Sequence, residues 1–213
     1  SSFLTSTFPT FRLIESILLE RREFFLLHRH LQRLRASAEY FNFQYSEEDV
    51  RSELARVTDG LSDEKWKVRL LLAKSGEIDI ETIPLDFDQR PMLRVALADQ
   101  PVNSNDKFLF HKTTNRAIYD RALAQRPHAN DVILFNERGE ITESTIANVV
   151  LELDGELVTP PQSSGLLAGT FRAQFLEEGK ICERVISVAE LKQVAGFFLI
   201  NSVHKWMKAT LVE

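Results

Sequence analysis

Hydrophobic and polar positions follow two different periods along the first part of the chain. The stretches FRLIESILL (residues 11–19) and EFFLL (23–27) are largely apolar and flank the polar turn ERRE, so we predict two paired strands. In residues 28–43 the apolar positions recur every three or four residues, which predicts an amphipathic helix. Residues 46–61 open with Ser46 and acidic residues, an N-cap pattern that predicts a second helix.

Strands separated by turn signals dominate the rest of the chain. Residues 66–85 predict a hairpin closed by a Ser-Gly turn, and residues 92–99 predict a further strand. Two short helices are predicted to end at Gly179 and Gly196, because glycine commonly follows the last turn of a helix. Other apolar runs bounded by turn residues predict strands in residues 131–161 (three strands), 181–188, 197–203 and 208–212.

This mixture of strands and a few helices indicates an α+β fold with two lobes. We expect a smaller α/β lobe in residues 1–100 and a larger, strand-rich and barrel-like lobe in residues 108–213. The polar segment 101–107 is rich in turn residues and is predicted to link them.

Composition excludes several classes of function. The net charge of −5 argues against a general nucleic-acid binder, because phosphate backbones call for a basic surface. A single cysteine, Cys182, is inconsistent with a disulfide framework or a cysteine-rich metal site, and the histidines do not form the HExxH pattern, so we expect no metal. The chain has neither an apolar run of membrane-spanning length nor a signal-peptide pattern, so we expect a cytoplasmic protein with no membrane partner.

A lysine stands at an unusual place in the second half of the chain. The apolar run at residues 108–110 reads as a strand that ends at Lys112. A lysine with a fixed backbone could form a Schiff base with a carbonyl cofactor and act as a base once released. Taken alone, a solvated loop lysine is the simpler interpretation.

A carbonyl cofactor such as pyridoxal phosphate also needs a site for its phosphate. The loop at residues 160–169 is rich in Pro, Ser and Gly and runs into a predicted helix, whose first N–H groups could bind phosphate. Gly169 would let the ligand approach the backbone closely. The alternative is a loop that caps its own helix through Ser163, Ser164 or Thr170. The loop does not match the nucleotide-binding fingerprints.

Two charged residues could serve the same cofactor. Glu143 precedes an apolar strand, where its carboxylate could hold the proton of a pyridinium ring. Arg33 lies beside the apolar face of the first predicted helix, and guanidinium is the preferred clamp for phosphate. Taken alone, each residue is more simply explained as a solvated surface charge.

Four segments, taken in their order along the chain, resemble the motifs of one enzyme family. They are HLQRLRASAEYFNF, HKTTNRAIYD, ITESTIANVVLELDGELVTPPQSSGLLAGTFR and FLINSV. Together they resemble the class IV aminotransferases, the fold type IV enzymes that use pyridoxal phosphate. The resemblance covers nearly the whole chain from Phe11 onward and implies a homodimer.

The resemblance also assigns residues to roles. Lys112 matches the Schiff-base lysine, Glu143 the partner of the pyridine nitrogen, and Arg33 a phosphate contact. Further positions match the family's cofactor-binding residues: Asn148, the phosphate-cup residues Gly169, Thr170 and Phe171, and the hydroxyl residue Ser202. The cup reads Gly-Thr-Phe where the family has Gly-Ile-Thr, a change that backbone amides would survive.

Within the family, the pattern K-x-x-N-R with Asn115 resembles the branch that cleaves 4-amino-4-deoxychorismate to 4-aminobenzoate and pyruvate in folate synthesis. That substrate is small and anionic, and the candidate contacts are Arg94, Asn115, Arg116 and His204. One alternative is a branched-chain or D-amino-acid type aminotransferase that uses the same lysine and glutamate. Another is a non-catalytic domain that assembles with an aminodeoxychorismate synthase partner, since the short amino terminus resembles the domain fused behind such a synthase.

Overall fold

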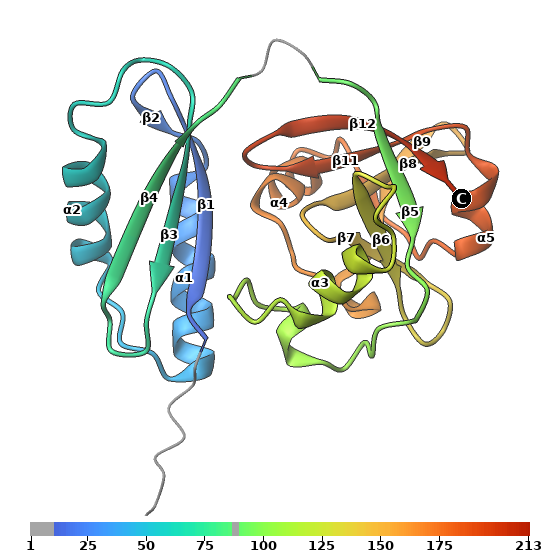
Figure 1. Ribbon diagram of the computed structural model, residues 1–213, viewed down its shortest axis with the longest axis horizontal. Helices are drawn as coiled ribbons and strands as arrows, with labels where there is room; N and C mark the ends of the chain where they lie inside the picture. The colour runs from blue at the N-terminus through green and yellow to red at the C-terminus, as the bar shows by residue number, and fades with distance from the viewer. Residues whose placement is uncertain (1–10, 87–89) are drawn as a thin grey trace, which may run out of the picture. The chain divides into compact units, whose positions relative to one another are not determined.

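The computed structural model describes residues 11–86 and 90–213 and divides them into two compact units (Figure 1). The first unit contains the described residues up to Leu85 together with Lys112–Asn115, and the second contains the remainder from Asp86. Residues 1–10, where we expected no signal peptide, lie outside the described part of the chain.

The first unit is a four-stranded antiparallel sheet with two helices. The sheet has the order β2-β1-β3-β4. Its elements are β1 (Leu13–Glu20), β2 (Glu23–Phe24), α1 (Leu27–Phe41), α2 (Glu47–Thr58), β3 (Trp66–Leu72) and β4 (Ile78–Pro84). Alternate residues of β1 and β3 pack with Leu31 and Leu34 of α1 and with Val50 and Leu54 of α2 in one core. The Ser46 hydroxyl accepts from the backbone N–H of Asp49, so the predicted cap is confirmed.

The second unit is built on a closed barrel. Six strands follow one another around it in the order β8-β11-β12-β5-β6-β7, and pairing of β7 with β8 closes the ring. The barrel strands are β5 (Leu93–Leu97), β6 (Asp131–Phe135), β7 (Ile141–Ser144), β8 (Asn148–Leu153), β11 (Phe197–Asn201) and β12 (Lys205–Val212). β9 (Glu156–Thr159) and β10 (Cys182–Glu183) continue the sheet beyond β8. The predicted α+β fold with a barrel is confirmed.

Short helices complete the second unit. They are the 3₁₀ helices η1 (Lys107–Leu109) and η2 (Gln162–Ser164) and the α-helices α3 (Ala117–Ala124), α4 (Thr170–Glu177) and α5 (Val188–Gln193). The core of the barrel includes Val95, Ile133, Val149 and Leu199, each from a different strand. No helix in the described part of the chain combines the length and apolarity that crossing a membrane requires.

The boundary between the units differs from the prediction. The chain divides at Leu85, and the expected linker at 101–107 belongs to the second unit. There β5 pairs with β12 and β6, and the backbone N–H of Val102 donates to the carbonyl of Phe135 at 2.8 Å. Turn residues mark a change of direction, and here the chain turns within the second unit.

Two local predictions were also wrong. Residues 108–110 do not form a strand, because η1 begins at Lys107 with the Asp106 side chain accepting from the N–H of Phe108. Residues 131–161 contain four strands and not the three that were predicted. The apolar stretch from Ile141 to Leu153 breaks after Ser144, whose hydroxyl accepts from the N–H groups of Ile146 and Ala147 and so stabilises a tight turn.

Candidate active site

The backbone of Lys112 is fixed by β1 and not by a strand of its own. The carbonyl of Lys112 accepts from the N–H of Ile14 at 2.9 Å, and Thr113 forms a β-bridge with Leu13. Thr114 binds Arg12 twice, through a backbone bond of 2.9 Å and through its hydroxyl at 2.8 Å. The half-buried lysine is therefore anchored at the start of the central strand of the first unit.

Arg33 lies in a buried charge cluster that the sequence analysis missed. Its Nε and Nη2 donate to the two oxygens of Glu15 at 2.9 and 2.7 Å. The Nδ1 of His30 lies 2.6 Å from Oε2 of the same carboxylate. Glu15 is only 1% exposed because it follows the inward alternation of Leu13 and Ile17 on β1. An acidic residue at a core position of a strand was the signal that could have revealed it.

The charges in this cluster set its protonation. Burial alone would raise the pKa of Glu15, but the charge of Arg33 and the hydrogen bonds from His30 and Arg33 outweigh it and lower that pKa to about 2. Burial lowers the pKa of His30, against the opposing effect of Glu15, and the positive charges of Arg33 and Lys112 lower it further. At neutral pH the cluster therefore holds an anionic Glu15 and a neutral His30 beside the guanidinium of Arg33.

In the second unit, Glu143 presents a buried carboxylate on β7. The side chain is 5% exposed, and its Oε2 accepts from the hydroxyl of Tyr119 at 3.1 Å and from the backbone N–H of Leu167 at 3.3 Å. Burial raises the pKa of Tyr119 well above its ordinary value, and the adjacent charge of Glu143 adds to the effect. Tyr119 therefore remains a protonated donor.

Asn148 and Glu143 hold the same residue of the neighbouring loop. They face each other across the β7–β8 hairpin. Asn148 Nδ2 donates to the carbonyl of Leu167 at 2.9 Å, while the N–H of Leu167 binds Glu143. A Cβ atom on Gly169 would lie 2.2 Å from Asn148 Oδ1, so the chain needs glycine there. The candidate pyridine partner and the candidate phosphate loop are thus fixed with respect to each other.

The residues predicted to form the phosphate cup lie at the start of α4. Gly169 is the N-cap and, as a glycine, has no side chain that could cap the helix. The Ser164 hydroxyl donates to Glu140 Oε2 at 2.9 Å. Thr170 and Phe171 are buried at the first helical positions, and Phe171 packs edge-on against Phe175.

A buried arginine that the sequence analysis overlooked follows the cup. Arg172 is 4% exposed, and its Nη2 donates to the Pro160 carbonyl at 3.0 Å and to Glu183 at 3.1 Å. Burial lowers its pKa, against the opposing charges of Glu183 and Glu143. Its position directly after the cup could have drawn attention, since a buried cation favours a nearby anion.

The remaining predicted site residues lie in three places: the turn between β11 and β12, strand β5, and the segment of the first unit that follows Lys112. Ser202 is buried in the turn between β11 and β12, whose backbone is held by Asn201 Oδ1 through the N–H groups of Val203 and His204. The His204 carbonyl accepts from Arg90. Exposed Arg94 lies on β5 in the second unit, whereas exposed Asn115 belongs to the first unit.

Arg116, a predicted substrate contact, has structural partners. Its Nη2 donates to the carbonyl of Thr145 at 2.5 Å, and its guanidinium carbon lies 4.6 Å from the centre of the Tyr119 ring. Thr145 in turn donates to Asp131 Oδ1 from its hydroxyl at 2.6 Å and from its N–H at 3.3 Å. The guanidinium therefore stabilises the turn that follows Glu143.

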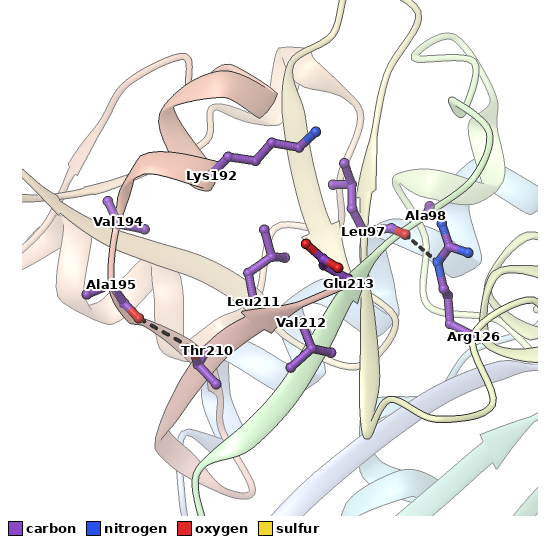
Figure 2. Close-up of a pocket in the computed structure, with 10 residues that line it drawn as sticks. All are labelled: Leu97, Ala98, Arg126, Lys192, Val194, Ala195, Thr210, Leu211, Val212 and Glu213. Carbon is purple, nitrogen blue, oxygen red and sulfur yellow. Dashed lines mark hydrogen bonds between the residues drawn. The ribbon is translucent and has the colours of Figure 1, made fainter.

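A cavity of about 500 Å³ lies elsewhere in the second unit (Figure 2). Arg126, Lys192 and Glu213 contribute charges to it, and Leu97 and Val194 are among its apolar lining residues. The Arg126 Nε donates to the Leu97 carbonyl at 3.0 Å. None of the predicted site residues lines this cavity. Within residues 11–86 and 90–213, no group of three or more His, Cys, Asp or Glu side chains gathers as a metal site requires.

Comparison with known proteins gives matches along almost the whole chain. The profile of the family described as "Amino-transferase class IV" matches residues 12–212. A Schizosaccharomyces pombe protein named "Putative aminodeoxychorismate lyase" is 34% identical over 199 residues, covering 89% of this chain and 85% of that protein. A Thermotoga maritima protein named "Probable branched-chain-amino-acid aminotransferase" is 32% identical over 193 residues, covering 84% and 68%. The crystal structure of a Mesorhizobium loti protein described as a "Putative amino-acid aminotransferase" matches with a TM-score of 0.87 at 34% identity, covering 95% of this chain and 100% of that one.

Proposed function

The chain belongs to the class IV aminotransferase family, and on that premise we propose that it is a pyridoxal-phosphate-dependent lyase. The reaction we assign is the conversion of 4-amino-4-deoxychorismate to 4-aminobenzoate and pyruvate. One observation carries the cofactor assignment: the buried carboxylate of Glu143 and the start of α4 are joined through Leu167. The choice of lyase is supported by the K-x-x-N-R pattern at Lys112 and by the relative named as such a lyase.

The residues present fit pyridoxal phosphate. A pyridinium nitrogen calls for a buried anionic acceptor, and Glu143 has one oxygen held by two donors. A phosphate calls for backbone N–H groups at a helix start, and α4 begins at a glycine that a larger residue could not replace without displacing Asn148. A carbonyl group calls for an amine on a fixed backbone, which Lys112 provides.

When bound, pyridoxal phosphate supplies an electron sink for the carbon that carries the substrate's amine. Lys112 would hold the cofactor through its amine and, once the substrate's amine has taken its place, would remove the proton from the ring carbon that bears nitrogen. The bond from the ring to the enolpyruvyl oxygen would break as the ring becomes aromatic, and Lys112 would return the proton to the departing enolpyruvate, which gives pyruvate. Proton transfer by a positioned side chain contributes about 10²- to 10⁴-fold to rate.

Glu143 and Arg33 have supporting roles in this proposal. An anionic Glu143 keeps the pyridine nitrogen protonated, which is the form that withdraws electrons. Arg33 offers a guanidinium whose direction is set by two hydrogen bonds to Glu15. A charge fixed in this way loses little side-chain entropy when it binds an anion.

A second candidate is amino transfer to a 2-oxoacid, which the similarity to the Thermotoga maritima protein favours. It would use the same Lys112 and Glu143. The two reactions differ in their products, since the lyase releases pyruvate from a single substrate and the transaminase needs an amino acceptor.

The test starts from purified protein mixed with pyridoxal phosphate. Borohydride should trap the cofactor on the peptide that contains Lys112, as read by mass spectrometry, and Lys112→Ala should abolish this adduct. Lys107→Ala, which removes an exposed lysine from η1, is the matched control and should leave it intact. A colourless protein with no trapped adduct would disprove the cofactor assignment.

Substrate assays then separate the reactions. Pyruvate released from 4-amino-4-deoxychorismate without an added 2-oxoacid supports the lyase. Amino transfer to a 2-oxoacid with no pyruvate release would overturn it in favour of the transaminase.

A further inference from the structure

We propose that Tyr119 is a positioning residue for Glu143, whose carboxylate it orients and keeps anionic. The inference rests on the proposed function, in which Glu143 binds the pyridine nitrogen. Tyr119 is separated from Lys112 by six residues of the sequence and touches none of the reacting atoms in that proposal. Its effect is exerted through the carboxylate.

Two donors bind the same oxygen of Glu143. The Tyr119 hydroxyl and the Leu167 N–H both donate to Oε2, at 3.1 and 3.3 Å. Two donors on one oxygen restrict rotation of the carboxylate about its terminal C–C bond. This restriction sets the direction in which the other oxygen points. Both donors also stabilise the charged form of the carboxylate, since a hydrogen bond to an ionised acceptor favours ionisation.

Burial makes the hydroxyl hard to replace by water. Tyr119 is 8% exposed and Glu143 is 5% exposed. The Tyr119 ring packs with Leu109, Val132 and Leu134 in a hydrophobic cluster that is separate from the core of the barrel. Loss of the hydroxyl alone would leave the ring in place and remove one of the two donors that fix Oε2.

Arg116 also contacts the Tyr119 ring. The two residues lie three apart at the start of α3, where their side chains can meet on one face. The guanidinium carbon is 4.6 Å from the ring centre, and the same side chain binds the Thr145 carbonyl. The start of α3 therefore contacts the β7–β8 hairpin at two points, the Glu143 carboxylate and the turn that follows it.

Tyr119 could instead serve only as a core side chain, and Tyr119→Phe separates the two roles because it keeps the ring. The control is Tyr45→Phe, which removes a hydroxyl bonded to the Leu31 carbonyl in the first unit. We would measure the pKa of Glu143 in the cofactor-free protein by NMR of its side-chain carboxyl carbon. Tyr119→Phe should raise that pKa by about one pH unit, and the control should not change it. An unchanged pKa of Glu143 in Tyr119→Phe would overturn the proposal.

A second variant keeps the test decisive if Tyr119→Phe does not fold. Site-specific 3-fluorotyrosine at position 119 gives a more acidic phenol and a stronger donor, so it should lower the pKa of Glu143. A pKa that stays the same or rises would refute the assignment.

The same variants then serve as a test in the holoprotein. Loss of the Tyr119 hydroxyl should weaken pyridoxal phosphate binding about threefold to tenfold, read by titration of the visible absorption band, because the Glu143 carboxylate loses a donor that orients it. Because the NMR measurement needs no cofactor, its result stands apart from the proposed function. A protein that binds no pyridoxal phosphate refutes that function, whereas an unshifted Glu143 refutes the role of Tyr119.

Discussion

Glu143 and Asn148 face each other across the β7–β8 hairpin and bind the two ends of one peptide residue, Leu167. Glu143 accepts from the N–H of Leu167 and Asn148 donates to its carbonyl. The hairpin thus fixes the loop that leads into α4. This relationship makes the loop's position depend on two side chains whose removal can be tested separately.

Asn148→Ala should loosen the loop without disturbing the barrel. The substitution removes one hydrogen bond to a partly buried carbonyl, for which we expect a loss of about 1 kcal/mol in the free energy of unfolding. Amide hydrogen exchange should speed up at residues 165–169 and stay unchanged in β5 and β12. Equal protection of the loop in both proteins would show that Asn148 does not hold it.

Gly169→Ala should be destabilising for a steric reason that Asn148 sets. The new Cβ would lie 2.2 Å from Asn148 Oδ1, so the side chain or the loop must move. We expect a loss of about 1 to 3 kcal/mol in the free energy of unfolding, typical of an overpacked site. In an Asn148→Ala background the loss should be smaller, and the double-mutant cycle measures the coupling. Additive losses would contradict a direct clash.

Glu15→Gln should change how the free energy of unfolding depends on pH. The pKa of Glu15 is lowered from 4.5 to about 2 in the folded protein, so its stabilising contribution is present above the unfolded pKa and is lost as pH falls toward 2. The shift corresponds to about 3 kcal/mol at neutral pH. The glutamine variant should therefore show a flatter loss of stability between about pH 4.5 and 2, measured by urea unfolding. Glu39→Gln, on the exposed face of α1, should retain the parent's slope.

Arg33→Lys should destabilise the first unit although it keeps the charge. An ammonium cannot reproduce the two parallel hydrogen bonds that the guanidinium makes to Glu15. We expect a loss of about 1 to 3 kcal/mol, since the buried carboxylate would be left with fewer donors. Arg35→Lys, which changes an exposed arginine paired with Glu39, should cost less than about 0.5 kcal/mol. Thermal unfolding of the two variants gives the comparison, and equal losses would contradict the role of the buried pair.

Local pattern predicted much of the fold. The apolar run of β1, the three- and four-residue spacing in α1 and the Ser46 cap of α2 depend on residues close together in the sequence. The hairpin of β3 and β4 was predicted for the same reason. The family resemblance, carried by ordered motifs, indicated Lys112 and Glu143 before any coordinate was known.

For short apolar runs, in contrast, the sequence did not correctly predict whether they form strands. Residues 108–110 form part of a 3₁₀ turn because Asp106 caps it, and the chain breaks after Ser144 because that hydroxyl binds two N–H groups. Both side chains compete locally with the strand hydrogen bonds that apolar content favours.

The sequence by itself determined which residues alternate inward, where helices begin and which family the chain belongs to. Only the tertiary structure decided the partners of the charged groups. Arg33 meets Glu15 from 18 residues away, and Glu143 meets both Tyr119 and Leu167 at a separation of 24. Burial periodicity reports that a position faces a core, but the group it meets there depends on how distant segments pack. For that reason Lys112 could be recognised from its motif, while the strand that anchors it could not.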